Sequence, residues 1–432
     1  MSFALIMVLV ILFGMLIVGA PVVFAIGTAA ASYFVIKPDM LGELIVFPHK
    51  FFTGMDSFVF LAIPLFTLSG ELMSQTGMMD KLVGFVRLFV GRFRGGMAYV
   101  NVLASMMFGG ISGSALADVA ALGPIEVEMM RKDGYDPTFS AALTASSAIQ
   151  GPIIPPSIPF VIFASLTNAS VGALFMGGLV PGILLGLGQC VVIWYLGRKR
   201  GFPKHDIRFT TKEKLNIIYT AISALIMPLI IIGGIITGIF TATEAAAVAV
   251  FYALIVGLFF YRNITLRTLF EALKSTICTT AGIYLIIGFT GIISWILAME
   301  GLPAMITSFV ASHDVSAYSL LFFVNIFFLF NGMWISDTAQ LILFAPIFAP
   351  IFSSMGVSVI HFGVVMVVNV MISMITPPYG TALYLAAGIS QSTLKDIVRE
   401  VLPFLGACIA VLFLITYCPP LITTVPKLFG LM

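Results

Sequence analysis

The two halves of the sequence match at a fixed offset of 222 residues, across segments rich in Gly, Pro and Ser. The matching positions are Phe108, Gly110, Ser114, Pro124, Ile125, Gly134, Pro155, Pro156 and Pro181 against Phe330, Gly332, Ser336, Pro346, Ile347, Gly356, Pro377, Pro378 and Pro403. With 22 prolines in 432 residues, chance predicts roughly half of one Pro/Pro coincidence, and four occur. Paired Gly/Pro-interrupted segments in an apolar chain are typical of secondary transporters, whose binding site lies between two repeats.

The composition is that of a polytopic membrane protein. Hydrophobic residues make up 60% of the chain and charged residues only 9%, which leaves too little polar surface to cover a soluble fold. The net charge of +2 is spread over short loops and indicates no nucleic-acid partner. The apolar stretch Ser2 to Val18 has no basic residue before it, so we expect a retained helix rather than a signal peptide.

Apolar segments of about 20 residues predict an all-α fold of membrane spans. They run near 3–18, 21–36, 58–76, 138–167, 171–196, 216–236, 238–260, 276–298, 359–389 and 403–422, and the first two are short enough to be tilted or joined. Two further stretches, about 96–131 and 317–354, read as re-entrant hairpins around polar, glycine-containing tips. Met79 to Phe93 and Leu394 to Leu402 are short and amphipathic, and we interpret them as interfacial arms between moving and fixed parts.

Lys and Arg counts predict the topology. With the amino terminus outside and the two hairpins entering from opposite faces, 18 of the 21 Lys and Arg residues lie inside, and only Lys37, Lys50 and Lys427 lie outside. We therefore expect two inverted repeats, 1–196 and 216–432, joined by a basic cytoplasmic linker at 197–215.

Each hairpin is followed by a span that contains two adjacent prolines, Pro155-Pro156 or Pro377-Pro378. A continuous helix through either pair would cost about 3 kcal/mol per proline, so we expect the spans 138–167 and 359–389 to be broken. Unpaired carbonyls beside Ser and Thr hydroxyls form a hard-oxygen set suited to Na⁺. The candidate Na⁺ residues are Gly110, Ser112, Ser114, Gly151, Ser157, Gly332, Ser336, Asp337, Ser373, Thr376 and Gly380.

Helix amino termini beside these breaks favour an anion between the repeats, which suits a carboxylate substrate. The candidate substrate-binding residues are Ser112, Ser114, Gln150, Pro155, Pro156, Ser336, Thr376, Pro377 and Pro378. Kinks and helix packing are the plainer explanation for such residues, but the same pattern occurs twice at one offset.

Six acidic residues fall in apolar surroundings, where ionisable groups are functional candidates: Glu71, Asp118, Glu126, Glu128, Glu244 and Asp337. Asp337 follows a hairpin tip and could ligate a cation, cap the next helix or relay protons. We expect Asp118 to cap the second arm of the first hairpin. We expect Glu126 and Glu128 to be solvated or paired with Arg131 and Lys132.

Other chemistry has little support. The four cysteines lie singly in apolar stretches, the four histidines are scattered, and the sequence holds no Gly-Lys-Ser/Thr phosphate loop. We therefore expect no zinc, haem or nucleotide, and no enzymatic activity. An intramembrane hydrolase would need a Ser/His or paired-Asp constellation that the broken spans lack, and a channel would usually take its pore from symmetric subunits or charged rings.

Four ordered motifs carry a resemblance: GGISGSALAD at 109–118, GPIIPPS at 151–157, ISDTAQ at 335–340 and ITPPYG at 375–380. At these residues the chain resembles the large membrane subunit (DctM) of tripartite ATP-independent periplasmic (TRAP) transporters, in the ion-transporter superfamily. The resemblance covers essentially the full chain. It implies Na⁺ coupling, an elevator mechanism and location in the bacterial inner membrane.

The resemblance also implies two partners, a small four-helix membrane subunit and a periplasmic substrate-binding protein. We expect a separate chain to supply the small subunit, because the first span starts at residue 3. Substrates would be organic acids such as C4-dicarboxylates, 2-oxo acids or sialic acid. The closest alternative is a Na⁺- or H⁺-coupled carboxylate symporter of the same superfamily that works without a binding protein.

Overall fold

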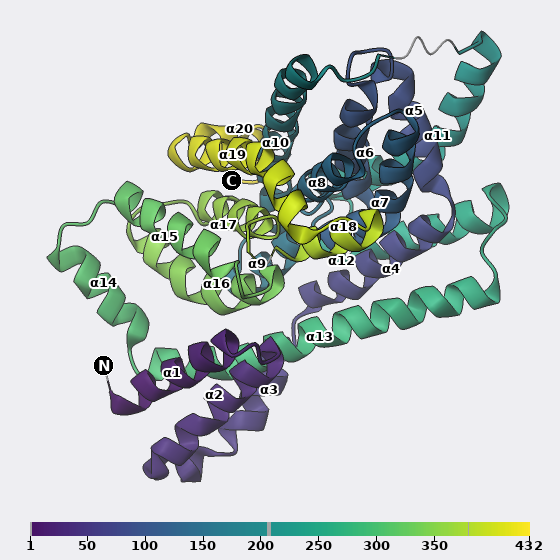
Figure 1. Ribbon diagram of the computed structural model, residues 1–432. Coiled ribbons are helices and arrows are strands. Elements are labelled where there is room, and N and C mark those ends of the chain that lie inside the picture. Colours follow the sequence, from purple (N-terminus) through teal and green to yellow (C-terminus); the bar gives the residue numbers. More distant parts are fainter. Residues whose placement is uncertain (1, 205–208, 379) are drawn as a thin grey trace.

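The computed structural model describes residues 2–204, 209–378 and 380–432, and the described residues are almost entirely helical (Figure 1). Seven of the described helices are long and apolar enough to cross a membrane. The elements are α1 (Phe3–Ile17), α2 (Val22–Ile36), η1 (Pro38–Glu43), α3 (Val46–Met55), η2 (Phe58–Leu61), α4 (Ala62–Gln75), α5 (Met78–Val90), α6 (Gly96–Ser112), α7 (Ala115–Lys132), α8 (Pro137–Ala148), α9 (Ile158–Thr167), α10 (Val171–Arg200), α11 (Thr211–Ile236), α12 (Ala242–Ile255), η3 (Val256–Phe260), α13 (Leu266–Met299), α14 (Leu302–Ser312), α15 (Ala317–Asn331), α16 (Asp337–Ser354), α17 (Val359–Ser373), α18 (Thr381–Ser390), α19 (Leu394–Tyr417) and α20 (Pro420–Leu428).

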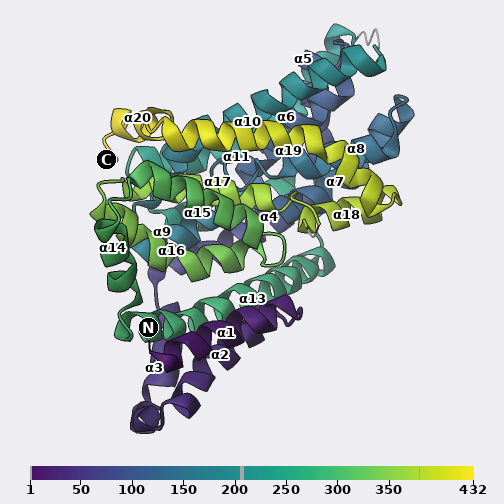
Figure 2. The ribbon, with the colours of Figure 1, turned by 60° about the vertical axis from the view of Figure 1, so that its left-hand side comes forward.

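The helices form two groups. In the first, which we call the α13 layer, α13 packs against α2, α3 and α4, α1 packs on α2, and α12 packs against α4 and α11. The second, the hairpin core, contains α6 to α10 and α15 to α20. Figures 1 and 2 both show α13 with α1 to α3 lying to one side of the hairpin core. The groups meet where α4 packs on α6 and α9, and where α13 packs on α16.

The two hairpins fall where the sequence predicts re-entrant segments. The first, α6 and α7, turns at Gly113, whose φ of +60° lies in the left-handed region that glycine adopts without strain. Ser114 then caps α7 by accepting a hydrogen bond from the Ala117 amide at 3.4 Å. The second hairpin, α15 and α16, turns through residues 332–336, and Ser336 precedes α16 in an extended conformation without a side-chain cap bond.

Both proline-containing spans are broken. One helix ends at Ala148 and α9 begins at Ile158, while α17 ends at Ser373 and α18 begins at Thr381. Proline lacks an amide hydrogen and its ring clashes with the preceding turn, so the chain unwinds over these residues. Ser157 caps α9 and also donates to the Pro152 carbonyl, which ties the two ends of the first break together.

Three helices are longer than the sequence indicates. Leu394 to Leu402, expected as a short separate piece, forms the first part of α19, which runs without interruption from Leu394 through Pro403 to Tyr417. The stretch expected as a linker at 197–215 is partly helical, since α10 continues to Arg200 and α11 begins at Thr211. The span expected at 276–298 belongs to a longer helix, α13, of 34 residues. In each case polar residues extend an apolar helix instead of ending it.

Two short helices, α5 and α14, occupy equivalent places in the two repeats, and the sequence interpretation missed α14. The helix α5 packs between α6 and α11, and α14 packs between α13 and α16. Each lies in sequence between a helix of the α13 layer and the first arm of a hairpin. Applying the 222-residue offset to α5 (Met78–Val90) gives 300–312, which coincides with α14 (Leu302–Ser312). The repeat itself was therefore a better signal than amphipathicity.

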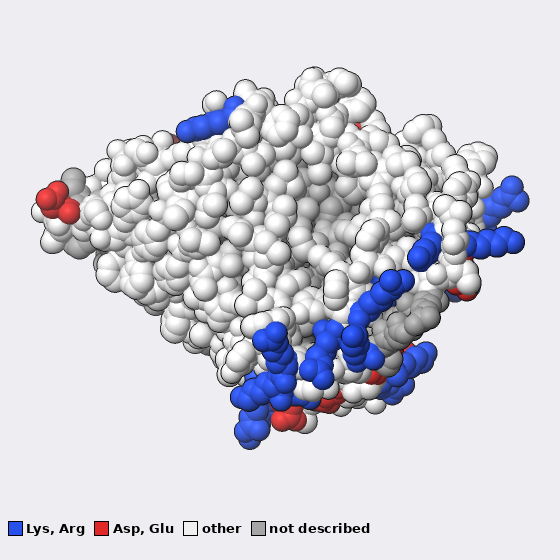
Figure 3. All heavy atoms as spheres, turned by 90° about the horizontal axis from the view of Figure 1, so that it is seen from above, with Lys and Arg blue, Asp and Glu red and all other residues white. Residues whose placement is uncertain are grey.

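Lys and Arg side chains gather along one edge of the molecule, as Figure 3 shows. Arg198, Lys199 and Arg200 lie in the last turn of α10, and Lys212 and Lys214 lie at the start of α11. Basic residues at helix ends are the usual marker of one membrane face.

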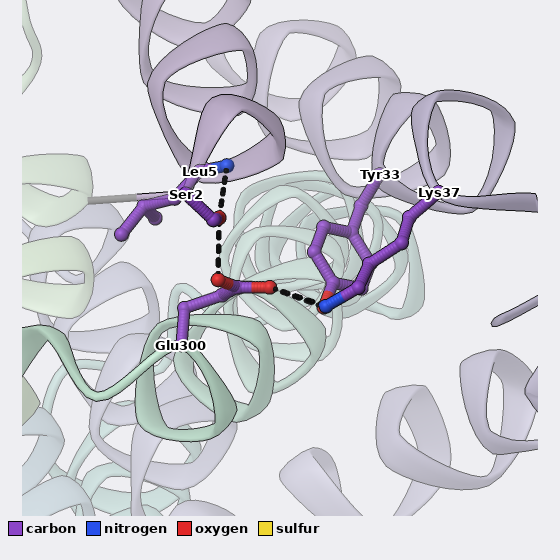
Figure 4. A network of polar contacts seen from close by, with 5 residues as sticks. All are labelled: Ser2, Leu5, Tyr33, Lys37 and Glu300. Atoms are coloured by element: carbon purple, nitrogen blue, oxygen red, sulfur yellow. Dashed lines mark hydrogen bonds and ion pairs between the residues drawn. The ribbon is translucent and has the colours of Figure 1, made fainter. Parts of the chain in front are cut away.

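A polar cluster fastens the ends of three helices in the α13 layer (Figure 4). Glu300, directly after α13, accepts hydrogen bonds from Ser2 at 2.5 Å, from Tyr33 at 2.7 Å and from Lys37 at 3.0 Å. The Ser2 hydroxyl, with smaller contributions from Tyr33 and Lys37, lowers the pKa of Glu300 to about 2 against the burial that raises it. Glu300 thus joins the start of α1 and the end of α2 to α13.

We expect Glu300→Gln to destabilise the protein by about 1–3 kcal/mol, because it weakens three hydrogen bonds to a charged acceptor. The folded-state pKa lies below the ordinary value of 4.5, so the stabilisation is full above about pH 4.5 and is lost as the pH falls toward about 2. Thermal unfolding of wild type and variant in detergent across this range measures it. Glu271→Gln, in the exposed Arg267–Glu271 pair, is the control and should change little. A difference in thermal stability between wild type and Glu300→Gln that does not change with pH would contradict the role of the Glu300 charge.

Candidate functional site

A cavity of about 820 Å³ lies between the α13 layer and the hairpin core. The hairpin core contributes both tips, with residues 112–117 and 337–338, together with Pro152, Ile158, Pro159, Met374 and Thr381. The opposite wall comes from α4 and α13, through Thr67, Gly70, Glu71, Ser74, Thr279 and Ile283. Parts of the chain more than 200 residues apart therefore build one site.

Four helices begin at this cavity. The lining includes Ala115 at the start of α7, Ile158 at the start of α9, Asp337 at the start of α16 and Thr381 at the start of α18. The first turn of each helix has amide hydrogens without an intrahelical partner, and each amino terminus carries roughly half a positive charge. Among the described residues that line the cavity there is no Lys, Arg or His. The wall facing α4 can therefore bind an anion through helix termini and hydroxyl groups.

The predicted substrate residues divide into two sets. Ser112 and Ser114 line the cavity, whereas Gln150, Ser336 and Thr376 are not among its lining residues, nor are the four paired prolines. Gln150 is buried and donates to Gln189 at 2.6 Å. Pro156 instead lies against the tip of the first hairpin: a Cβ built on Gly113 would lie 2.8 Å from the Pro156 carbonyl oxygen.

In the first repeat, the predicted Na⁺ residues meet where hairpin and break cross. A Cβ built on Gly109 would lie 2.2 Å from the Gly151 Cα, so only glycine fits there. Gly110 lies beside the Pro155 carbonyl, and Ser157 is occupied in capping α9. The carbonyls of Gly151, Ile153, Ile154 and Pro155 accept no hydrogen bond from the described residues. These oxygens fit a hard cation such as Na⁺.

In the second repeat, Gly332 crosses the break at Ser373, where a Cβ on Gly332 would lie 2.0 Å from the Ser373 Cβ. The Ser373 hydroxyl donates to the Val370 carbonyl at 2.7 Å, and Thr376 donates to the Ile372 carbonyl at 3.0 Å. The Thr376 carbonyl accepts from the Gly380 amide, whereas the Ile375 and Pro377 carbonyls accept from no described residue. This break therefore also has free carbonyl oxygens.

Asp337 is the first residue of α16 and lines the cavity. Its Oδ2 accepts from the Thr338 hydroxyl at 3.3 Å. Ser336, directly before it, makes no side-chain hydrogen bond to the described residues. A carboxylate and a free hydroxyl therefore stand together at the tip of the second hairpin, beside a helix amino terminus.

Asp118 and Glu126 lie in surroundings other than those predicted, whereas Glu128 makes the predicted ion pairs. Asp118 is not a cap: it is buried inside the first hairpin, where Ser105 donates to it at 3.4 Å. Glu126 is not solvated but buried, and accepts from Asn101 at 2.7 Å. Glu128 pairs with Arg131 at 2.7 Å and with Lys132 at 3.4 Å, as predicted.

The buried cluster around these residues was missed by the sequence interpretation. Ser147 donates to Asn101 and contacts Ser105, so polar side chains from α6, α7 and α8 form a continuous hydrogen-bonded chain. The sequence did contain a signal for this cluster. Polar residues recur at helical spacing on both arms of the hairpin, at Asn101 and Ser105 and at Asp118 and Glu126. Glu244 proves to be a capping residue, since it forms a capping box with Thr241 at the start of α12.

Residues 9–421 match the family model described as "Tripartite ATP-independent periplasmic transporter, DctM component". The chain is 38% identical to the sialic acid TRAP transporter large permease SiaM of Vibrio cholerae, over 96% of this chain and 97% of that one. It is 36% identical to the C4-dicarboxylate large permease DctM of Pseudomonas aeruginosa, over 94% of both chains. Against the sialic acid permease SiaT of Haemophilus influenzae it is 35% identical, covering 98% of this chain but 68% of the relative.

Among solved structures, the MtrF protein of Neisseria gonorrhoeae superposes with a TM-score of 0.64 at 14% identity, over 96% of this chain and 97% of that one. This likeness shows a shared fold and says nothing of substrate. The four motifs, the broken helices and the cavity between the two groups lie within the matched range. The family match over nearly the whole length leads to one assignment: this chain is not an enzyme but a multi-pass membrane protein that belongs to the DctM family, the large permease component of TRAP transporters.

Proposed function

We propose that the chain is the membrane permease of a Na⁺-coupled system that imports an organic acid of the C4-dicarboxylate, 2-oxo acid or sialic acid type. The observation that carries this proposal is the convergence of four helix amino termini on one cavity. Oriented peptide dipoles in a membrane interior stabilise an anion that has left water, and they do so without a fixed cation that would hold it too tightly for release.

Sodium coupling is supported by the free oxygens beside the cavity. The unpaired carbonyls at the two breaks and the Asp337 carboxylate form hard-oxygen sets, one in each repeat. A bound Na⁺ would neutralise negative charge near the substrate and so raise the affinity for an anion, which couples the two. The substrate-binding set supported by the cavity is Ser112, Ser114, Pro152, Thr338 and Thr381.

We further propose an elevator mechanism in which the hairpin core slides against the α13 layer. The cavity lies at the boundary between the two groups, and α5 and α14 connect them at equivalent points of the repeats. In this proposal the repeats are inverted, the amino terminus is periplasmic, and the basic edge faces the cytoplasm of a bacterial inner membrane.

The proposed partners are a small four-helix membrane subunit on a separate chain and a periplasmic binding protein. The part of the SiaT relative that lies outside the match leaves room for such a subunit within that protein. The α13 layer exposes large apolar side chains such as Phe3, Val10, Phe24 and Phe52, which suit a membrane partner or lipid. A stand-alone carboxylate symporter is the second candidate, because the cavity by itself could bind a freely diffusing acid.

Uptake into proteoliposomes tests the function. We expect accumulation of labelled organic acid only with an inward Na⁺ gradient and with both partners present. Unchanged uptake when choline replaces Na⁺ and a proton gradient is supplied would contradict Na⁺ coupling. Uptake without any partner would favour the stand-alone symporter.

The elevator proposal predicts that a disulfide between Gly70→Cys and Ser112→Cys stops transport. A Cβ on Gly70 would lie 3.4 Å from the Ser112 Cβ, close to the separation that a disulfide needs. The bond would join α4 of the α13 layer to the tip of the first hairpin and prevent sliding. In a background without native cysteines, oxidation should reduce uptake by about 100-fold, and a reductant should restore it.

The control is a cysteine pair within the hairpin core. The hydroxyl oxygens of Thr138 and Ser392 lie 3.2 Å apart, so Thr138→Cys with Ser392→Cys offers a comparable bond inside the proposed moving body. This pair should leave uptake largely intact after oxidation. Full transport by the fully cross-linked Gly70/Ser112 pair would overturn the division into moving and fixed parts.

A further inference from the structure

The wall of the cavity formed by the α13 layer carries one carboxylate, Glu71. Its Oε1 accepts a hydrogen bond from the Ser275 hydroxyl of α13 at 2.8 Å. Its Oε2 accepts none from the described residues. Because Ser275 belongs to the same layer, this bond holds Glu71 on the wall and leaves one oxygen available to whatever fills the cavity.

Glu71 also lies beside the point where the two groups touch. The preceding residue, Gly70, packs against the tip of the first hairpin, and a Cβ built on it would lie 3.1 Å from the Ser112 Cα. Ser112 itself lines the cavity. A substrate held by the hairpin tips therefore has Glu71 within its reach on the other side.

The cavity is electrically asymmetric. The hairpin core side has four helix amino termini, each carrying roughly half a positive charge. It also has the Asp337 carboxylate, whose charge the proposed Na⁺ would neutralise. The side formed by the α13 layer has the negative charge of Glu71, and none of the described lining residues is a cation that could compensate it. A carboxylate on the substrate is stabilised on the first side and repelled on the second.

We propose that Glu71 is a specificity-determining residue that selects monocarboxylates carrying hydroxyl or N–H donors on their far end, and rejects dicarboxylates. The inference rests on the proposed function and narrows its substrate class. A hydroxyl or amide group would donate to the open oxygen of Glu71, whereas a second carboxylate would meet a like charge with no donor between them. A cavity of about 820 Å³ has room for a polyhydroxylated acid.

The test measures binding to the purified membrane complex in Na⁺, without the periplasmic binding protein, so that only the selectivity of the permease is observed. The probes are gluconate and N-acetylneuraminate as hydroxylated monocarboxylates, and succinate as a dicarboxylate. We expect wild type to bind at least one of the first two about tenfold more tightly than succinate. Glu71→Gln should weaken that binding about tenfold and strengthen succinate binding severalfold, because it keeps the shape and removes the charge.

Two variants separate this effect from a structural one. Ser74→Ala also alters the wall of the cavity but removes no charge, so it should leave the ratio of the two affinities unchanged. Ser275→Ala removes the hydrogen bond to the Glu71 carboxylate but keeps the carboxylate. This variant should bind hydroxylated acids only modestly more weakly than wild type does, and its affinity for succinate should stay low.

The outcomes distinguish the inference from the function on which it rests. Opposite changes of the two affinities in Glu71→Gln support it. A parallel change of both affinities, or an unchanged ratio, overturns the role of Glu71 while the proposed function stands. If wild type binds none of the three acids in Na⁺, this inference is wrong, and the proposed function stands only if the same complex binds a 2-oxo acid.

Discussion

Gly109→Ala is expected to reduce uptake by about 100-fold while the neighbouring Gly110→Ala is tolerated. The new Cβ at position 109 would lie 2.2 Å from the Gly151 Cα, which is backbone and cannot rotate away. The first hairpin would have to move off the break, and the tip and its carbonyl oxygens would be displaced together. At position 110 the nearest atom would be 3.4 Å away, an ordinary van der Waals contact.

The measurement is initial uptake in proteoliposomes, with thermal stability of the purified variants recorded in parallel. Overpacking of this kind costs about 1–3 kcal/mol, so the Gly109 variant is expected to fold but to bind poorly. The second repeat provides an independent check. Gly332→Ala would clash with the Ser373 side chain at 2.0 Å, and Ser373→Gly in the same chain should partly restore uptake. Equal activity of the Gly109 and Gly110 variants would contradict the proposed crossing of hairpin and break.

Asp337→Asn is expected to raise the Na⁺ concentration for half-maximal uptake by about 10- to 100-fold. Asp337 is the one acidic residue in the tip 332–338 of the second hairpin, and it stands next to the unbonded Ser336 hydroxyl and the cavity. Removal of its charge weakens the attraction for a cation, while the amide keeps its size and its place at the start of α16.

Sodium titrations of uptake measure this change at saturating substrate. Thr338→Val is the control, because it removes the hydroxyl that donates to Asp337 but leaves the carboxylate in place. It should shift the Na⁺ dependence much less. An unchanged half-maximal Na⁺ concentration in Asp337→Asn would move the cation site away from the second hairpin.

The hairpins and breaks could be predicted from the sequence because their causes are local. A Pro-Pro pair interrupts a helix wherever it stands, and Gly113 permits a left-handed turn that other residues resist. The ends of α19 and α10 could not be predicted in this way. Charged residues can either end a membrane helix or extend it into water, and the choice depends on what the extension packs against. At Arg200, the partner is Glu400 of α19, 2.6 Å away.

The candidate site could be predicted only in part for a similar reason. The sequence indicates which residues disrupt helices, but not which side of a break faces the cavity. Pro152 lines it, while Pro155 and Pro156 support the hairpin tip from behind. Glu126 was misplaced because Arg131 and Lys132 are near in sequence, whereas its actual partners, Asn101 and Thr144, come from the adjoining helices α6 and α8.

The two hairpins match in sequence at one offset, but their facing arms pack by different means. Ser105 and Glu126 lie in the polar chain of the first hairpin, and 222 residues later the same positions hold Phe327 and Phe348, whose rings lie 6.0 Å apart. At these two positions the first hairpin has hydrogen-bonding side chains and the second has aromatic rings. Neither interior can replace the other piecemeal, since a single exchange would leave a carboxylate among phenyl groups or a ring among unpaired amides. The two halves therefore share one pattern of tips and breaks, but their hairpins cannot be exchanged one residue at a time.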